Sequence, residues 1–366
     1  MSSAHLTQLR KWLIHSPPGE WMLHRVRELL IGALRQGPVP QHVAFVMDGN
    51  RRYARERRME TVEGHHLGAE ALAKILEVCY KSGVKVVTIY AFSVENFKRS
   101  KFEVDALMDM AKFKLRQVVQ HGELLQRYGA KIQVLGQKER LRKDVIEAID
   151  HAVNMTKDNG EKILNVCFPY TSRHEMTAAI RDTVKDYSRP VRPGPKRPFS
   201  ETRISRSIHT KQMNDMLHEQ HLEQQSSTDT STVDGDEADT SFDSSASDVE
   251  PSQSSQTSVS SSPAQRPSKQ ILHFPDPESI STATLDEHIW TAGTPPLDLL
   301  IRTSGVQRLS DFMLWQCHEN TKIVFVDCLW PEFDLWQFLP VMVEWQWKQR
   351  RAEEYRAPYN AAIKAN

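Results

Sequence analysis

Three short stretches of the chain place small, polar and cationic residues where phosphate chemistry would need them. The first reads DGNRR from Asp48, the second SVENFKR from Ser93, and the third RTSGVQRLS from Arg302. One carboxylate can hold Mg²⁺ that keeps waters and phosphate oxygens as its other ligands, and arginines bind phosphates through charge-assisted hydrogen bonds. The three stretches together offer more cationic charge than one phosphate needs, so they predict a site for two anionic groups.

The first stretch has a candidate metal ligand in Asp48. Gly49 permits a sharp turn after it, and Asn50 and Arg52 can point back at the same ligand. On these residues alone an alternative stays open, in which an Asx-turn caps the next helix and the arginines are solvated. Further along, Arg55, Arg57 and Arg58 are expected on the solvated side of that helix.

The other two stretches add further candidates. Ser93 is followed by Glu95, Asn96 and Arg99, before a helix that opens near Glu103. Arg302 is followed by Thr303, Ser304, Gly305, Arg308 and Ser310. The last stretch predicts a small-residue loop at a helix N-terminus, an arrangement that binds anions. It is not a P-loop, because GxxxxGK[ST] is absent.

Two histidines, His65 and His66, follow Gly64 at the opening of a predicted helix. His65 is a candidate for binding a diphosphate or for assisting the departure of a proton. For His66 simple packing is the favoured interpretation.

Alternating strands and helices must position these residues. Apolar, β-branched runs predict strands at 43–47, 84–92, 131–135, 163–168, 297–301 and 322–326. Helical patterns fall at about 66–82, 103–128, 138–159, 173–187, 308–318 and 334–356. This alternation predicts an α/β domain with a mostly parallel sheet covered on both faces. The candidates follow strand ends, where open parallel sheets bind ligands.

One break in composition divides the chain. Residues 188–285 begin basic and proline-rich and become acidic and serine-rich, with no Lys or Arg between Lys211 and Arg266. This composition predicts a largely disordered insertion, with a short helix around residues 210–222. The α/β domain is expected in two parts, 40–187 and 286–366. Residues 1–39 predict an amphipathic helical segment.

The N-terminal segment has two helical patterns separated by Pro17 and Pro18. In the second pattern the apolar residues fall near one face; they are Met22, Val26, Leu29, Leu30, Ala33 and Leu34. This face is expected to cover the domain's own core or a partner, and the alternative is a membrane surface. No apolar run approaches the roughly 20 residues that span a bilayer.

Charge and cysteine content exclude several classes. The formal net charge is zero, which argues against a polyanion-binding protein, and RRYARERR holds few aromatics for nucleic-acid binding. We therefore expect no nucleic-acid partner. The four cysteines form no CxxC and no zinc-binding spacing, so packed thiols are expected rather than disulfides.

The motifs taken together resemble the cis-prenyltransferase family, which includes undecaprenyl and dehydrodolichyl diphosphate synthases. The matching segments are HVAFVMDGNRRYA, EGH, TIYAFSVENFKRSKFEVDALM, DLLIRTSG, RLSDFMLWQ and LWPEFD. The resemblance covers about 40–187 and 285–350, and its details are most like the eukaryotic members. It implies a six-stranded, mostly parallel sheet with helices around a hydrophobic tunnel.

The resemblance also implies an activity: repeated addition of isopentenyl diphosphate to an allylic primer such as farnesyl diphosphate, with each new double bond cis. The product would be a long-chain polyprenyl diphosphate for dolichol synthesis and protein glycosylation. The tunnel would be walled by the apolar side chains of two helices, namely Leu72, Ile75, Leu76, Val104, Leu107 and Met108.

Roles for individual residues come with the resemblance. Asp48 should hold Mg²⁺ at the allylic diphosphate, and Asn50 and His65 are candidates for assisting proton removal. The residues expected around the allylic diphosphate are Gly49, Asn50, Arg51, Arg52 and Arg99. Those expected at the reacting ends and the primer's path are Phe92, Ser93, Asn96 and Glu103. Those expected to clamp isopentenyl diphosphate are Arg302, Arg308 and Ser310.

Two departures from the homodimeric members of the family predict a heteromer. Those members carry a metal-site glutamate at the position aligned near Thr321, and they end in an R-x-G tail that reaches the partner's active site; this sequence ends APYNAAIKAN. The expectation is therefore an accessory subunit that supplies the tail, with weak activity of the chain alone. By analogy the complex would lie peripherally on the cytosolic face of the endoplasmic reticulum membrane.

Two other functions compete with this interpretation. A catalytically silent accessory subunit would typically lack Asp48 and the pair Arg302 and Arg308, whereas all three are present. An aspartate-dependent phosphoryl transferase commonly has a second acid two residues after the first, and Asn50 occupies that place.

Overall fold

The computed structural model describes residues 17–120, 127–190, 211, 274–318 and 320–364. The chain groups into two compact units, one formed by Met1–Asp186 with Pro277–Asn366 and the other by Tyr187–Asp276. All the strands among the described residues, and the site described below, belong to the first unit. Most of the predicted insertion, including the helix expected around 210–222, lies outside the described residues.

The first unit is built on a sheet of six parallel strands in the order β3-β4-β2-β1-β5-β6. The strands are β1 (His42–Val46), β2 (Val86–Tyr90), β3 (Ala130–Leu135), β4 (Lys162–Cys167), β5 (Leu299–Arg302) and β6 (Lys322–Phe325). Central β1 pairs with β2 and β5, so Val43 lies between Val87 and Leu299. The predicted six-stranded α/β fold is confirmed, and every strand pair is parallel.

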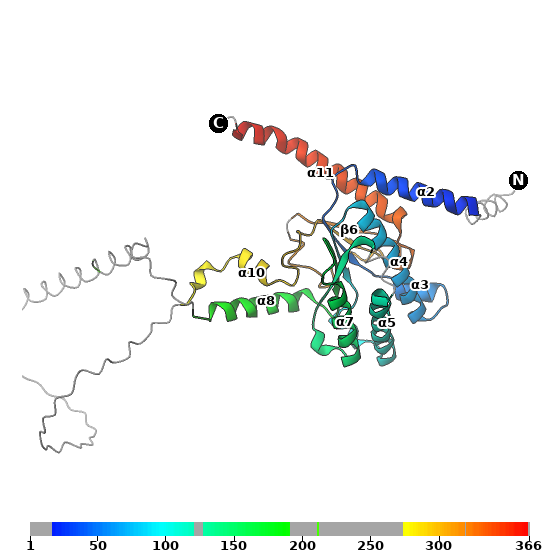
Figure 1. Ribbon diagram of the computed structural model, residues 1–366, viewed down its shortest axis with the longest axis horizontal. Coiled ribbons are helices and arrows are strands. Elements are labelled where there is room, and N and C mark those ends of the chain that lie inside the picture. The colour runs from blue at the N-terminus through cyan, green and yellow to red at the C-terminus, as the bar shows by residue number, and fades with distance from the viewer. Residues whose placement is uncertain (1–16, 121–126, 191–210, 212–273, 319, 365–366) are drawn as a thin grey trace, which may run out of the picture. The chain divides into compact units, whose positions relative to one another are not determined.

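Helices connect these strands (Figure 1). The α-helices are α2 (Pro17–Leu34), α3 (Asn50–Glu56), α4 (Thr61–Ser82), α5 (Lys101–Gln120), α7 (Lys143–Thr156), α8 (Ser172–Tyr187), α10 (Thr282–His288) and α11 (Leu335–Lys364). Short 3₁₀ helices are η1 (Val94–Lys98), η2 (Lys138–Arg140), η3 (Pro277–Ser279) and η4 (Trp330–Glu332). The 3₁₀ helix η3 and the start of α10 lie within residues 188–285, the predicted insertion.

Alternate residues of β1 enter two different hydrophobic clusters, as the period of two in a strand requires. Val43 and Phe45 pack in the cluster that holds Ile75 of α4 and Phe338 of α11. Ala44 and Val46 pack in the other cluster, with Phe312. The sheet is therefore covered on both faces, which explains the continuous apolar run in the sequence.

Helix α2 packs only part of its apolar surface on the domain. Ile31 and Leu34 are buried, and Gln346 Nε2 of α11 donates to Leu34 O at 2.6 Å. In Figure 1, α2 and α11 lie side by side. Met22 and Leu29, which the sequence places on the same apolar face as Leu34, are exposed. No helix among the described residues is long and apolar enough to cross a membrane.

The predicted helix at 308–318 is wrong. Residues 303–318 form turns, and Ser304, Ser310, Asp311 and Met313 all have positive φ. This loop is held by α8, because Asp311 accepts hydrogen bonds from the backbone N–H of Arg173 at 3.0 Å and from its Nε at 2.9 Å. Tertiary hydrogen bonds thus outweigh the local helical pattern.

Candidate active site

The turn after β1 is joined to the turn after β5. Thr303 Oγ1 donates to Asp48 O at 2.7 Å and accepts from Asp48 N at 3.1 Å. Gly49 has φ of 111°, a region that favours glycine, and a Cβ there would lie only 3.0–3.2 Å from atoms of Leu329. Two of the predicted stretches, about 250 residues apart in the chain, are therefore fixed against each other.

The Asp48 carboxylate lies next to the guanidinium groups of two arginines. Its Oδ2 accepts from Arg302 Nη2 at 2.8 Å and lies 3.7 Å from Arg52 Nη2, while Oδ1 accepts from Gly49 N at 2.7 Å. Partial burial acts to raise the pKa of Asp48, but the hydrogen bond from Arg302 and the charges of Arg302 and Arg52 outweigh it, so the pKa is lowered. Asp48 is therefore ionised at neutral pH.

Arg302 is the centre of this arrangement, although it is only 3% exposed. Its Nη1 donates to Arg308 O and to Ser310 Oγ, both at 2.6 Å. Its Nε is buried without a hydrogen-bond partner. Because buried polar groups are normally satisfied, this atom indicates a polar ligand of the loop.

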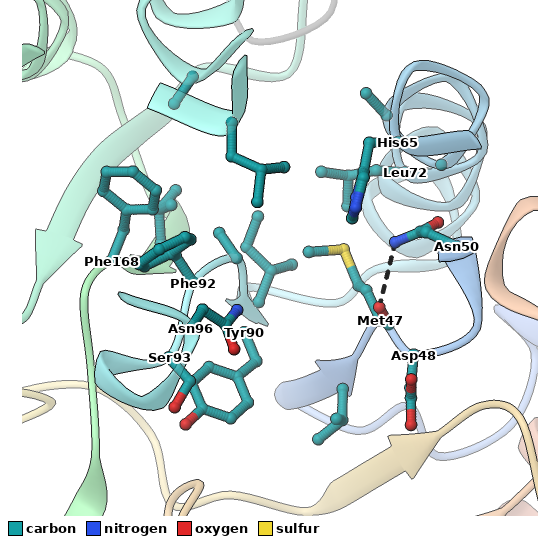
Figure 2. Close-up of a pocket in the computed structure, with 18 of the residues that line it drawn as sticks. Met47, Asp48, Asn50, His65, Leu72, Tyr90, Phe92, Ser93, Asn96 and Phe168 are labelled. Carbon is teal, nitrogen blue, oxygen red and sulfur yellow. Dashed lines mark hydrogen bonds between the residues drawn. The ribbon is translucent and has the colours of Figure 1, made fainter. Parts of the chain in front are cut away.

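Asn50 and His65 each present another buried atom without a partner, Oδ1 and Nε2 respectively. Asn50 Nδ2 donates to Met47 O at 3.4 Å (Figure 2). Gly68 of α4 makes room for the amide, because a Cβ at that position would lie 2.3 Å from Asn50 Oδ1. Burial lowers the pKa of His65 to about 4, with the nearby Arg99 charge adding to the effect. His65 is therefore neutral at pH 7 and able to accept a proton or a hydrogen bond.

Glu103 joins the second stretch to the first. Its Oε1 accepts from Arg99 Nη1 at 2.8 Å and lies 3.9 Å from Arg51 Nε and 4.0 Å from His65 Nε2. The carboxylate thus holds two arginines at the same edge of the site without taking up all their donors. Glu103 itself lines neither of the cavities described next.

The main cavity has a volume of about 710 Å³ and joins a polar mouth to an apolar interior. The predicted site residues that line it are Asp48, Asn50, Arg51, His65, Phe92, Ser93, Asn96, Arg99, Arg302, Arg308 and Ser310. In Figure 2, Asp48, Asn50 and His65 lie across the cavity from Ser93 and Asn96. The structure therefore brings 11 of the 14 predicted site residues to one cavity, and the exceptions are Gly49, Arg52 and Glu103.

The apolar interior lies between α4, α5 and the sheet. One stripe of α5 lines it, with Leu107, Met110, Ala111, Lys114 and Leu115 spaced as one helical face. Strands β2, β3 and β4 add Ile89, Ile132, Val134, Leu164 and Val166. The hydrophobic tunnel of the predicted fold is thus confirmed, but most of the residues that line it differ from those predicted.

Four of the six predicted wall residues do not line the tunnel. Leu72 and Leu107 do, whereas Ile75, Leu76 and Met108 are buried in the hydrophobic clusters, and Val104 packs beside one of them. The helices α4 and α5 each have an apolar surface wider than the tunnel, and the remainder packs on neighbouring elements.

A second cavity of about 600 Å³ adjoins the polar mouth and includes Gly49 and Arg52 in its lining. Arg55 and Thr61 also line it. Arg55, Arg57 and Arg58 are all exposed, so their expected place on the solvated side of the helix is confirmed, although Arg55 also borders this cavity. Arg57 pairs with Glu332 at 3.0 Å and packs over the ring of Tyr53.

Two residues that line the main cavity, Tyr90 and Trp330, were not predicted from the sequence. Tyr90, the last residue of β2, donates to Ser310 O at 3.3 Å and stacks on Phe312. Trp330 donates from Nε1 to Gly68 O at 2.8 Å and packs on Phe45. Tyr90 could have been found from its place at a strand end, beside the polar residues that follow it.

The described residues contain no cluster of three or more His, Cys, Asp or Glu side chains that could hold a metal. A single carboxylate is nevertheless enough for Mg²⁺, which usually keeps waters and takes substrate phosphate oxygens as ligands. Thr321 donates to Leu297 O at 2.6 Å, beside the amino end of β6, and lines neither cavity. His66 is exposed and also outside both cavities.

Comparison with known proteins gives consistent matches. The sequence matches the prenyltransferase family described as undecaprenyl diphosphate synthase over residues 46–229 and 247–353. A dehydrodolichyl diphosphate synthase complex subunit of Schizosaccharomyces pombe is 39% identical over 94% of this chain and 99% of its own length. A dehydrodolichyl diphosphate synthase complex subunit of Homo sapiens is 34% identical over 89% of this chain and 73% of its own length.

The fold is also found among solved structures. Lavandulyl diphosphate synthase from Lavandula x intermedia, solved with dimethylallyl diphosphate, superimposes with a TM-score of 0.57. The match covers 84% of this chain and 95% of the plant protein at 24% identity, so it supports the fold alone.

Proposed function

The chain belongs to the cis-prenyltransferase family of undecaprenyl diphosphate synthases, and we propose that it adds isopentenyl diphosphate repeatedly to farnesyl diphosphate. The product is a long-chain dehydrodolichyl diphosphate for dolichol synthesis and protein glycosylation. The observation that supports this most is one cavity that joins a cationic mouth around Asp48 to an apolar tunnel. A substrate with a diphosphate head and an isoprenoid tail matches both ends of it.

The two diphosphates have different binding residues. The allylic diphosphate lies against Gly49, Arg52 and Arg99, with its tail between Leu72 and Leu107. Isopentenyl diphosphate binds the loop after β5, where Arg302 Nε has no partner and the Arg308 side chain is exposed. Arg51 and Glu103 hold the edge of the allylic site, and Phe92, Ser93 and Asn96 line the reacting ends.

The reaction needs charge neutralisation and a proton acceptor. The C1–O bond of the allylic diphosphate breaks, C4 of isopentenyl diphosphate bonds to C1, and C2 of the added unit loses a proton. Arginines that surround the leaving oxygens stabilise the charge that develops there. His65 and Asn50 assist proton removal, because each has a buried polar atom without a hydrogen-bond partner beside the mouth.

Asp48 is the residue that would hold Mg²⁺. Its lowered pKa keeps the carboxylate ionised, and each of its oxygens retains acceptor capacity beyond the hydrogen bonds that it receives. A bound Mg²⁺ would neutralise charge on the diphosphate leaving group. The fit supports magnesium as the cofactor.

The partner is a second, accessory subunit that completes the site with an R-x-G tail. The support is that the relatives of S. pombe and H. sapiens are both named as subunits of a complex. The complex works on the cytosolic face of the endoplasmic reticulum membrane and is attached peripherally, because the growing product is a lipid. Exposed apolar residues such as Trp21 and Leu29 on α2 fit contact with a partner or a lipid surface.

Neither competing function gains support from the site. A silent subunit would not need the ionised Asp48, the buried Arg302 and an open tunnel together. A phosphoryl transferase would have no use for an apolar tunnel next to its aspartate.

The test is incorporation of radiolabelled isopentenyl diphosphate onto farnesyl diphosphate with Mg²⁺, with and without a co-expressed accessory subunit. Long-chain product, strongly increased by the second subunit and lost on chelation of Mg²⁺, is the expected result. The absence of long-chain product under both conditions would rule out the enzymatic function, and full activity of the purified chain would rule out the heteromer.

A further inference from the structure

Outside both cavities, one buried carboxylate contacts the loop after β5, residues 303–318. Glu175, in the first turn of α8, is completely buried and lines neither cavity. Burial raises the pKa of its carboxyl group, and the hydrogen bonds that the group receives only partly oppose this effect. A buried charge destabilises a fold unless its hydrogen bonds compensate for the lost water. The contacts of Glu175 therefore indicate what this carboxylate does.

Three uncharged groups donate hydrogen bonds to Glu175, and each belongs to a different segment. The hydroxyl of Tyr170, which follows β4, donates to Oε2. The backbone N–H of Trp290, between α10 and β5, donates to Oε1 at 3.0 Å. Gln316 Nε2, near the end of the loop 303–318, donates to Oε2 at 3.1 Å. The carboxylate thus joins the far end of this loop to α8 and to the segment that precedes β5.

The start of α8 also holds the middle of the loop. Ser172 N donates to Asp311 O at 2.8 Å, and Ser172 Oγ accepts from Leu314 N at 2.9 Å. Ser310 and Asp311 both have positive φ, which is a strained conformation for residues other than glycine. The surrounding contacts must therefore impose it. Together with Gln316, these contacts fix the loop at three points after Ser310.

A second set of contacts leads from Glu175 to Ser310 through aromatic rings. The Tyr170 ring, whose hydroxyl Glu175 holds, packs edge-on against Phe312 with 6.0 Å between the ring centroids. The Tyr90 hydroxyl lies 3.2 Å from Tyr170 O and 3.3 Å from Ser310 O. A change at Glu175 would therefore reach Ser310 from both sides of the loop.

We infer that Glu175 is a positioning residue for isopentenyl diphosphate, because it holds the loop that presents Arg308 and Ser310 to that substrate. The inference rests on the proposed function, which assigns this loop to isopentenyl diphosphate. Glu175 itself touches neither substrate, since it lines neither cavity. The primer's binding residues Arg52 and Arg99 belong to α3 and to the end of η1, outside the loop. Loss of Glu175 should therefore weaken the binding of one substrate and spare the other.

The test uses the full chain, with any subunit that copurifies. Glu175→Gln keeps the size of the side chain but replaces one acceptor oxygen by an amide that faces a donor. A misplacement of about 1 Å can cost about 10²-fold, so partial loosening of the loop should raise the KM for isopentenyl diphosphate about tenfold. The KM for farnesyl diphosphate and kcat should change less than about twofold, because the residues that set them keep their places.

Two further variants separate positioning from a general loss of stability. Gln316→Met removes the donor on the loop side, leaves Glu175 its other two donors, and should raise the same KM. The double variant should raise that KM no further than the larger single effect, since both changes break one contact. Thr183→Val is the matched control, because Thr183 is a buried residue two turns further along α8 that donates within the helix, to Ala179 O at 2.9 Å. Both KM values should stay at the wild-type value in this control.

Limited trypsin digestion reports on the loop without turnover. Arg308 is exposed, so the rate of cleavage after it, followed by mass spectrometry, rises as the loop opens. Cleavage should be faster in Glu175→Gln and Gln316→Met and unchanged in Thr183→Val.

Two results would overturn the inference. One is a wild-type cleavage rate and a wild-type KM for isopentenyl diphosphate in Gln316→Met and in folded Glu175→Gln. The other is an equal rise of the KM for both substrates, which would mean that Glu175 supports the whole site rather than the loop. A wild-type chain that makes no polyprenyl product would refute the proposed function instead, and the cleavage rates would still decide whether Glu175 holds the loop.

Discussion

Replacement of Arg302 by methionine should separate its two roles, as a structural clamp and as a substrate ligand. The guanidinium is almost completely buried and makes three hydrogen bonds, to Asp48, to Ser310 and to the backbone of Arg308. Removal of one partner of a buried ion pair typically costs about 3–5 kcal/mol. The Asp48 side chain is 35% exposed, so water replaces part of the loss and the low end of that range applies.

We therefore expect Arg302→Met to lower the free energy of unfolding by about 3 kcal/mol. Arg308→Met is the matched comparison, because that side chain is exposed and makes no ion pair or hydrogen bond within the described residues. It should change stability by less than about 0.5 kcal/mol. Both variants should raise the KM for isopentenyl diphosphate by about tenfold or more, since each removes charge-assisted hydrogen bonds of roughly 1.5–3 kcal/mol.

Urea unfolding at pH 7, followed by circular dichroism, measures the stability of both variants beside the wild type. An equal stability of Arg302→Met and Arg308→Met would show that the buried hydrogen bonds of Arg302 do not stabilise the fold. A large stability loss in Arg308→Met would contradict the expected difference as well.

Three further predictions address the metal ligand, the tunnel and the pH dependence of stability. Asp48→Asn should lower kcat by about 10²–10³-fold at saturating Mg²⁺, as expected when a group that stabilises the leaving charge is lost; an unchanged kcat would remove Asp48 from the metal site. Ala111→Leu should shorten the polyprenyl product seen by thin-layer chromatography, because the added carbons project into the tunnel; the control Ala106→Leu, at a position of α5 outside the tunnel lining, should leave product length unchanged. Burial lowers the pKa of His42 to about 4 in the folded chain. As the pH falls, the unfolded chain therefore binds a proton at this histidine before the folded chain does. The contribution of neutral His42 to the free energy of unfolding, complete above pH 6.5, is lost as the pH falls toward 4. This contribution amounts to about 2 kcal/mol between pH 7 and pH 5. The unfolding free energy of His42→Gln should therefore fall less over that interval than the unfolding free energy of the wild type. An equal fall in both proteins would show that His42 is not buried as a neutral ring.

The sequence predicts the sheet and the mouth of the site well because both depend on local patterns. The six strands are apolar runs bounded by polar residues, and in a parallel sheet their carboxyl ends must meet at one edge. Asp48 and Ser93 lie within three residues after the ends of β1 and β2, and Arg302 is the last residue of β5. Their meeting is therefore a consequence of strand order and needs no knowledge of side-chain packing.

The loop after β5 and the tunnel wall depend on contacts that no local pattern contains. Residues 308–318 have a helical pattern, but Asp311 and Met313 adopt positive φ where α8 holds the loop. On α4, Leu72 lines the tunnel whereas Ile75 packs in the core. Both residues belong to one apolar surface, and the neighbouring elements decide which side of it faces the cavity.

The most direct test of the account is a crystal structure of the chain with Mg²⁺, isopentenyl diphosphate and a non-reactive thio analogue of farnesyl diphosphate. The analogue's diphosphate is expected beside Asp48 and Arg99, its prenyl tail between Leu107 and Leu164, and isopentenyl diphosphate against Arg302. A prenyl tail outside the tunnel, or both diphosphates away from Asp48, would contradict it.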